Sequence, residues 1–387
     1  MHIFQNLALS RHKLAAPSGL ATLWMWLALT FAFGVAVPAQ ATLVGVTNLV
    51  TDDQTVNAAV ITDPNLVNAW GVSHSGGSPF WVSDNGTGVS TLYSVNPITG
   101  IPAKVGLTVT IPGAGNVTGQ AFAGVAGSFN GDNFVFVSED GTVSGWRGAL
   151  GTNAETFVVG STTNSYKGAA FASIGGNGYL YAANFKTGAI DVIKGKAAAP
   201  DLTGTFIDPN LPGGFAPFNV ENLRGRIYVT YAQQAGGADE NDGPGLGFVS
   251  VFDLQGNFLG RVASQGTLNA PWGLEIAPAS FREFAGDLLV GNFGDGRINV
   301  FSLGGSPSFV GQLLGLDGKP IMIDGLWDLI AGNGGNGGST QAVYFSAGPV
   351  DESHGLFGVL AVPEPGTLTL FGIALAGLGV GRRRKLS

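Results

Sequence analysis

Residues 288–301 read LLVGNFGDGRINVF, and this stretch decides the fold. It holds two short apolar segments, Leu288–Gly291 and Ile298–Phe301, on either side of a polar turn that ends in Asp295 and Gly296. Asp-Gly pairs supply the positive φ that a tight hairpin requires, so the stretch predicts two antiparallel strands. Both segments are apolar on both faces, which is typical of sheets that stack against neighbouring sheets.

The same pattern recurs six times between residues 42 and 361, with a period near 50. The second strands of the repeats are expected at 80–83, 134–137, 179–182, 227–230, 288–291 and 343–346. The third strands are expected at 92–95, 142–146, 190–193, 249–252, 298–301 and 356–359. All-β repeats of this period with four strands each predict a six-bladed β-propeller as one domain over residues 42–361.

The two ends of this domain are expected to meet. Repeat six reaches the end of its third strand near Ala361, so its fourth strand is missing locally, whereas residues 43–61 form a strand-like stretch with no repeat of their own. An open sheet edge invites unwanted pairing, and a closed ring removes it. We therefore expect the N-terminal segment to supply the outer strand of the last blade.

Residues 1–41 have the composition of a secretory signal peptide. Arg11 and Lys13 precede an apolar run at 20–37, and the small residues Ala39 and Ala41 follow it. A basic region, an apolar region and a small-x-small site are the marks of a segment that is cleaved on export, here after Ala41. The general secretion machinery is the partner that this segment implies.

Residues 362–387 have the pattern of a second targeting segment, which consists of three parts in a fixed order. The motif Pro363-Glu364-Pro365 precedes an apolar stretch at 366–381, and a basic cluster follows at Arg382, Arg383, Arg384 and Lys385. This tail resembles the PEP-CTERM sorting signal of Gram-negative bacteria. The resemblance implies a short transmembrane helix that enters the inner membrane transiently, processing by an exosortase, and delivery to the cell envelope, outer surface or exopolysaccharide matrix.

The body also resembles a known family. The stretches that carry the resemblance are residues 63–71, 268–274, 288–299, 324–327 and 354–358. They are similar to an uncharacterised family of secreted bacterial propellers, with the six-bladed architecture of NHL-repeat and gluconolactonase-like proteins. The family implies the fold and carries no established activity.

Composition excludes several kinds of function. The 387 residues contain no cysteine, which excludes disulfides, thiolate metal sites and cysteine nucleophiles. The formal net charge of −8 argues against a nucleic-acid partner. The 63 glycines accompany 45% hydrophobic residues, so the chain can bury a core and uses many of its glycines in turns.

The loops that lead into the inner strands, and those that join second to third strands, are predicted to share one face. Candidate metal ligands before the inner strands are Asn68, Asn219, Asn269 and Asp324. Further candidates on the same face are Asp84, Asp140, Asp295 and His354. Carboxylate and amide oxygens are the ligands that Ca²⁺ prefers, so Ca²⁺ is the candidate cofactor. The alternative is that these side chains cap their own turns.

No catalytic group is apparent in the pattern. After removal of residues 1–41 only His74 and His354 remain, and they are predicted on opposite faces of the propeller. The sequence therefore favours a non-enzymatic module of the cell surface or exopolysaccharide matrix, which binds extracellular polysaccharide or a surface protein. The alternative is a divalent-metal-dependent hydrolase or lactonase, with its site at the central mouth.

Overall fold

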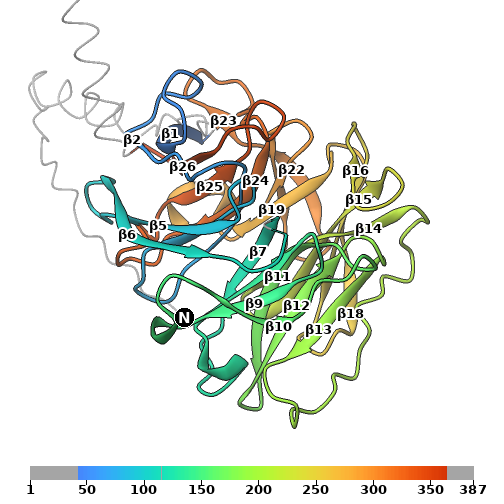
Figure 1. Cartoon of the computed structure of the whole chain (residues 1–387). Helices are drawn as coiled ribbons and strands as arrows, with labels where there is room; N and C mark the ends of the chain where they lie inside the picture. The colour runs from blue at the N-terminus through green and yellow to red at the C-terminus, as the bar shows by residue number, and fades with distance from the viewer. Residues whose placement is uncertain (1–41, 115, 364–387) are drawn as a thin grey trace, which may run out of the picture. The chain divides into compact units, whose positions relative to one another are not determined.

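The computed structural model describes residues 42–114 and 116–363, and these form six β-sheets arranged as the blades of a propeller (Figure 1). The predicted signal peptide, with Ala39 and Ala41, lies outside the described residues, as does the tail from Glu364 onward. The described residues contain three short 3₁₀ turns, Phe129–Gly131, Gly148–Leu150 and Ala279–Phe284, and no helix long and apolar enough to cross a membrane.

The blades follow one another along the chain. Blade 1 contains β3 (Ala69–Ser73), β4 (Phe80–Asp84), β5 (Val89–Val95) and β6 (Pro102–Thr110). Blade 2 contains β7 (Val117–Phe122), β8 (Phe134–Ser138), β9 (Val143–Trp146) and β10 (Glu155–Val158). Blade 3 contains β11 (Tyr166–Ile174), β12 (Asn177–Asn184) and β13 (Ala189–Lys194).

Blade 4 contains β14 (Phe215–Leu223), β15 (Arg226–Gln234), β17 (Gly247–Phe252) and β18 (Phe258–Ser264), with β16 (Glu240–Asn241) beside β15. Blade 5 contains β19 (Pro271–Ile276), β20 (Leu288–Asn292), β21 (Ile298–Ser302) and β22 (Ser308–Gln312). Blade 6 contains β24 (Leu326–Ala331), β25 (Val343–Ala347), β26 (Leu356–Ala361) and β1 (Leu43–Thr51), and β2 (Ile61–Thr62) and β23 (Leu314–Gly315) both pair with β1. All twelve predicted second and third strands coincide with observed strands.

The ring closes as the sequence predicts. Strand β1 runs antiparallel to β26, with Val46 opposite Leu360 and Val50 opposite Phe357. Val50 is fully buried, in a core cluster that includes Phe80 of blade 1. The first strand of the described chain thus completes the last blade and also packs against the first one.

Blade 3 differs from the prediction of four strands per repeat, because residues 195–214 form no fourth strand. The backbone of this segment bonds to the β17–β18 turn of blade 4 instead, from Gly204 to Gln255 (2.9 Å) and from Phe206 to Gly256 (3.0 Å). Phe206 is buried against Tyr181, with ring centroids 5.2 Å apart. The prolines of the segment favour this irregular path, because proline donates no hydrogen bond to a sheet.

Six inner strands surround the axis, and each has a register shift near its start. Four of them carry glycine in the shifted segment, at positions 71, 119, 168 and 273. A Cβ at Gly71 would lie 2.8 Å from the carbonyl oxygen of Thr118, and one at Gly273 would lie 2.7 Å from that of Trp327. Glycine is therefore required there, because the inner strands of adjacent blades touch backbone to backbone.

The other two inner strands carry a polar side chain in that segment, and each side chain bonds to the next blade. Asn219 of β14 donates from Nδ2 to the carbonyl oxygen of Trp272 (2.9 Å). Asp328 of β24 accepts a hydrogen bond from the backbone nitrogen of Val72 (2.6 Å). The two side chains thus link blade 4 to blade 5 and blade 6 to blade 1.

The sequence Asp-Pro-Asn-Leu occurs twice, at 63–66 and 208–211, and makes the same contact each time. Asp63 pairs with Lys104 of β6 at 2.6 Å, and Asp208 pairs with Arg261 of β18 at 2.5 Å. Both carboxylates are fully buried. Each pair ties the segment that leads into a blade to the outer strand of that blade. Loss of either partner would leave a buried charge.

Candidate functional site

The inner strands all run in the same direction, so the propeller has two distinct faces. We call the face where the inner strands begin the entry face, and the opposite one the exit face. A backbone hydrogen bond from Asn85 to Asn68 (3.0 Å) joins a second-to-third-strand loop to the start of an inner strand. The two kinds of loop therefore share the entry face, as the sequence predicts.

The four predicted metal ligands take up different positions. Asn68 donates from Nδ2 to Glu352 (2.6 Å), and Asn269 accepts from the backbone nitrogen of Gly243 (2.6 Å). Asp324 accepts from the backbone nitrogen of Val350 (2.9 Å) and lines an entry-face pocket of about 290 Å³. Asn219 lies within β14, completely buried, and not in a loop before the strand as expected.

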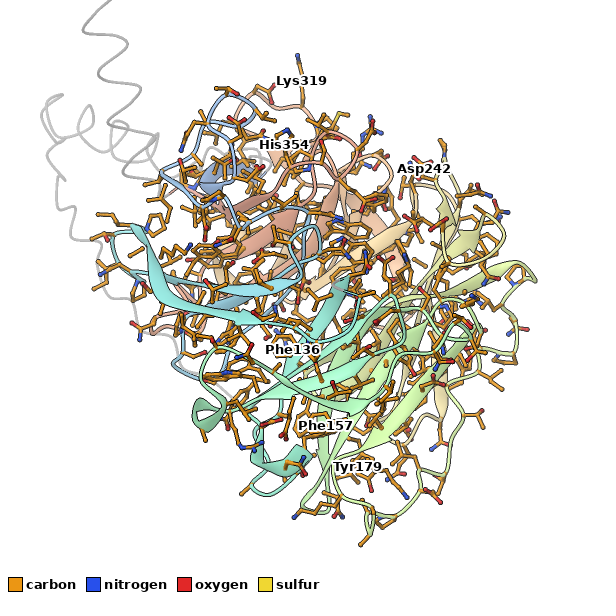
Figure 2. All side chains as sticks on the ribbon, in the orientation of Figure 1. Phe136, Phe157, Tyr179, Asp242, Lys319 and His354 are labelled. Carbon is orange, nitrogen blue, oxygen red and sulfur yellow. The ribbon has the colours of Figure 1, made fainter. Side chains whose placement is uncertain are left out.

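The four further candidates are also separated. Asp140 lines an entry-face cleft, whereas Asp295 bonds within its own turn to Asn292 (2.9 Å). His354 lies in the entry-face loop of blade 6, and its Nδ1 is 2.8 Å from a carboxylate oxygen of Asp52. Figure 2 labels His354 and also Asp242, which lies in a loop of blade 4 on the same face. The structure therefore gathers no single ring from these residues.

Asp84 lies inside the protein and not on the entry face. Its side chain is fully buried at the end of β4, and neither carboxylate oxygen has a hydrogen-bond partner among the described residues. Burial raises the pKa of Asp84 well above its usual value, because a charge without partners is costly away from water. The residue is therefore part of the interior of blade 1.

Three tryptophans fill the axis beneath the entry face. The rings of Trp70 and Trp327 stack at 3.6 Å, and Trp272 meets both of them edge-on. All three are at most 2% exposed, so they are core residues of the axis. Lys167 lies over the Trp70 ring at 5.2 Å and forms an ion pair with Glu139. The tryptophan rings and this ion pair together close the entry end of the axis.

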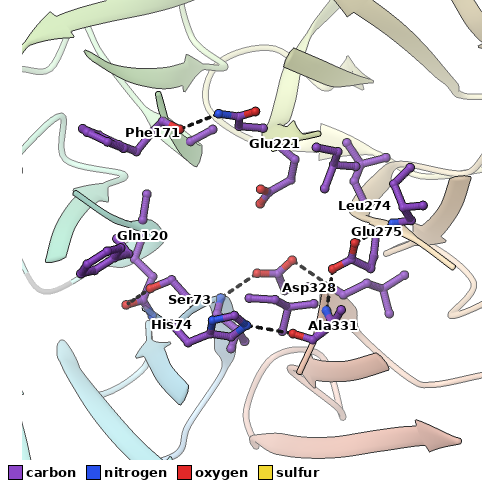
Figure 3. Close-up of a pocket in the computed structure, with 18 of the residues that line it drawn as sticks. Ser73, His74, Gln120, Phe171, Glu221, Leu274, Glu275, Asp328 and Ala331 are labelled. Atoms are coloured by element: carbon purple, nitrogen blue, oxygen red, sulfur yellow. Dashed lines mark hydrogen bonds between the residues drawn. The ribbon is translucent and has the colours of Figure 1, made fainter. Parts of the chain in front are cut away.

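The exit face instead opens into a central cavity of about 540 Å³. Three acidic side chains come together in it from three inner strands, Glu221 of β14, Glu275 of β19 and Asp328 of β24 (Figure 3). His74 lies at its wall, where Nε2 is 2.8 Å from the carbonyl oxygen of Ala331. His74 and His354 thus lie on opposite faces, as predicted. We refer to this space as the exit-face cavity.

The backbone positions two of these acids rigidly. Asp328 accepts from the nitrogens of Val72 (2.6 Å) and Leu329 (2.8 Å). Glu275 accepts from the nitrogens of Ile276 (2.6 Å) and Ala331 (2.5 Å). The carboxylate of Glu221 has one backbone neighbour of this kind, the nitrogen of Asn222, so it is less constrained than the other two and is the carboxylate most available to a ligand.

All three acids bind protons more tightly than usual. Burial raises the pKa of Glu275 to about 7, and burial together with the nearby Glu275 raises that of Asp328 to about 8. Burial and the charges of Asp328 and Glu275 raise the pKa of Glu221 well above 4.5. Like charges in one cavity disfavour simultaneous ionisation, so Glu275 and Asp328 are partly protonated near neutral pH.

Substituting Glu221→Gln is expected to change how stability depends on pH. Because the pKa of Glu221 is raised in the folded state, its contribution favours folding most at low pH and is lost as pH rises through the raised pKa. The variant should therefore unfold about 2 °C or more above the parent at pH 8 and near the parent at pH 5. Thermal unfolding at both pH values measures this, and an equal shift at both would contradict it.

Sequence reasoning did not identify the three acids. A signal was present, because Glu221 and Glu275 follow apolar inner-strand residues and Asp328 directly follows Trp327. An acidic residue inside an otherwise apolar strand is unusual, because buried carboxylates are normally paired with another polar or charged group. The predicted ligands lie mostly in loops, where Asp and Asn are common because their side chains stabilise turns.

Among residues 42–114 and 116–363, no group of three or more His, Asp or Glu side chains has the arrangement that holds a metal ion. The predicted ligands that bond to the backbone already use part of their acceptor capacity in the fold. Binding of Ca²⁺ therefore stays a prediction.

The tail matches a protein-family model. Residues 361–385 match the PEP-CTERM protein-sorting motif. Two solved structures are similar to this chain. A virginiamycin B lyase from Staphylococcus aureus is 9% identical, with 83% of this chain and 99% of that chain covered and a TM-score of 0.48. The periplasmic gluconolactonase PpgL of Pseudomonas aeruginosa is 15% identical, with 76% and 88% covered and a TM-score of 0.41. Neither likeness bears on activity.

Two proteins of Acanthamoeba polyphaga mimivirus are similar over most of the propeller. "Uncharacterized protein R648" is 32% identical over 291 residues, which cover 70% of this chain and 70% of that protein. "Uncharacterized protein L690" is 31% identical over 325 residues, which cover 77% and 81%. The chain therefore belongs to the same family as these two uncharacterized proteins, and it ends in a PEP-CTERM protein-sorting motif.

Proposed function

We propose that the protein is exported, sorted by an exosortase and displayed at the cell surface or in the exopolysaccharide matrix, where it acts as a binding module. The PEP-CTERM motif at residues 361–385 supports the route. The propeller suits a binding role, because its backbone-to-backbone axis holds the loops and cavities of both faces on a rigid frame. Extracellular polysaccharide is the partner that this destination favours.

The ligand that we assign to the exit-face cavity is a saccharide unit carrying a primary amine. The convergence of Glu221, Glu275 and Asp328 carries this proposal, since carboxylates pair with an ammonium group through charge-assisted hydrogen bonds. The cavity volume of about 540 Å³ lies within the range of small-ligand pockets, which is roughly 300–1,000 Å³. Gln120 and Asn222 also line the cavity, and their amides are held by hydrogen bonds to the carbonyl oxygens of Gly71 (2.8 Å) and Phe171 (2.9 Å), so they form a fixed polar wall.

The test is binding of partly deacetylated chitin oligomers to the full-length chain, measured by calorimetry. An ammonium group lowers the pKa of nearby carboxyls, so binding should release protons and should strengthen from pH 6 to pH 7.5. Glu221→Gln is expected to weaken binding about tenfold, because it removes the negative charge of the carboxylate that the backbone holds with the fewest hydrogen bonds.

Fully acetylated oligomers of the same length are the matched ligand control, because they lack the amine and should bind at least tenfold more weakly. Equal binding of both oligomers, or unchanged affinity in Glu221→Gln, would contradict the assignment of this ligand. Folding of the variant is checked by its thermal unfolding at pH 5, where parent and variant should agree.

A second candidate is the metal-dependent hydrolase or lactonase with its site at a mouth of the axis. Its support is the small entry-face pocket, in which Asp324 lies together with Asp242, Asp351 and Glu352, although the described positions of these side chains do not have the arrangement that holds a metal ion. Under this alternative the purified protein contains stoichiometric divalent metal and Asp324→Asn loses it, whereas the binding module needs none. Elemental analysis separates the two.

A further inference from the structure

A cleft of about 680 Å³ lies on the entry face between blades 2 and 3, on the opposite side of the propeller from the exit-face cavity. Its lining is unusually rich in hydroxyl and amide side chains. These are Thr142, Thr156, Ser161, Thr162, Asn164 and Ser165. Hydroxyl and amide groups both donate and accept hydrogen bonds, which is also the property of saccharide hydroxyls.

The charged residues of the cleft are already paired within the protein. Asp140 accepts from the backbone nitrogens of Ala114 (2.7 Å) and Thr142 (2.9 Å). Glu139 pairs with Lys167, and Lys186 donates to the carbonyl oxygen of Thr162 (2.5 Å). The fixed charges are therefore paired within the fold. Thr142 Oγ1 also donates to Asp140, Ser161 Oγ bonds to Thr163, and Asn164 Oδ1 accepts from Asn184. Among the described residues of the cleft, the hydroxyls left for a ligand are those of Thr156, Thr162 and Ser165.

Ser165 is the residue that points to a ligand. It lines the cleft and is only 1% exposed, yet its Oγ has no hydrogen-bond partner among the described residues. A buried hydroxyl without a partner destabilises the folded state, because it has lost its hydrogen bonds to water, so such a group in a cavity wall calls for an explanation. Its backbone is held in place, since the nitrogen donates to Asn184 (3.2 Å) and the carbonyl accepts from Phe185 (2.8 Å).

We propose that this cleft is a second binding site, which takes a neutral saccharide and satisfies the Ser165 hydroxyl through one of its hydroxyl groups. The site is independent of the exit-face cavity and lies on the other face. A propeller with one saccharide site on each face joins two polymer segments at once, which raises its effective affinity for a matrix far above that of either site. This makes the protein a cross-link between matrix polymers.

The test uses neutral oligosaccharides of four to six glucose, galactose or mannose units, with the full-length chain and calorimetry or a glycan array. Ser165→Ala is expected to weaken binding about three- to tenfold, the effect of one hydrogen bond. The same change should leave thermal stability unchanged or slightly higher, because the hydroxyl has no partner in the fold. Ala238→Trp, which fills the cleft from its blade 4 wall, should abolish binding.

Ser83→Ala is the matched control, because Ser83 is also a buried serine without a partner but lines no cleft. It should leave binding unchanged. Glu221→Gln should likewise leave neutral ligands unaffected, so failure of this site and failure of the amine site are distinguishable. The proposal is overturned if no neutral oligosaccharide binds at millimolar concentration, or if binding persists unchanged in Ser165→Ala or in a folded Ala238→Trp.

Discussion

Gly119→Ala is expected to destabilise the propeller by about 3 kcal/mol or more, although it adds one methyl group. The added Cβ would collide with the backbone nitrogen of Ala169 and with the backbone of Gly168. Neither contact can be relieved by a side-chain rotation, so the inner strands of blades 2 and 3 must separate. In a closed ring a displacement between two blades shifts all the others. The packing density between the sheets leaves no space that could take up the displacement locally.

Gly260→Ala is the control for this substitution. Gly260 lies in the outer strand β18, has nothing within 4 Å of an added Cβ, and does not have a positive φ. Denaturant unfolding monitored by tryptophan fluorescence should show a large fall in midpoint for Gly119→Ala and a change within about 0.5 kcal/mol for Gly260→Ala. Comparable behaviour of the two variants would refute the close axial packing of glycine.

Val50→Asp in the closing strand is expected to cost about 4 kcal/mol or more, enough to open the ring or prevent folding. Val50 is fully buried between blade 6 and blade 1, where a carboxylate finds no partner. The strand is far in sequence from the rest of blade 6, so its attachment depends on its pairing with β26 and on such side chains. Loss of β1 would leave β26 as an open edge, which favours aggregation.

Val46→Asp provides the comparison within the same strand. Val46 also pairs with β26, but its side chain is 42% exposed, so a carboxylate there stays hydrated. We expect a change within about 1 kcal/mol for Val46→Asp, and rapid cleavage near the N-terminal strand only in Val50→Asp. Limited proteolysis followed by mass spectrometry detects the difference. Similar resistance of both variants would mean that β1 contributes little to closure.

Much of the architecture could be predicted because each repeat carries its own local signals. The turn around Asp295 and Gly296 and the apolar strands beside it depend on φ preference and on alternation along a few residues. The missing fourth strand of blade 3 could not be predicted in this way. Phe206 leaves the expected strand path to pack against Tyr181 and to bond with blade 4, which is a choice between two distant surfaces.

The candidate site was less predictable than the fold. Asp84 and Asp295 occupy similar turns in the sequence, yet the first is buried inside blade 1 and the second bonds within its loop. Glu221, Glu275 and Asp328 are separated by about fifty residues each, and only the curvature of the ring brings them into one cavity (Figure 3). The angle between neighbouring blades is not encoded in any short stretch of sequence. A pattern of a few residues therefore cannot show that these three side chains meet.

The sequence by itself determined the number of blades, the positions of the second and third strands of each blade, and the closing role of the N-terminal segment. It did so because those features follow from turn chemistry and alternation that act within a few residues. Only the tertiary structure decided that glycine must line the axis, that the tryptophans close the entry end, and that a carboxylate cavity and a hydroxyl-lined cleft lie on opposite faces. These depend on distances between blades, which are set by packing across the whole ring.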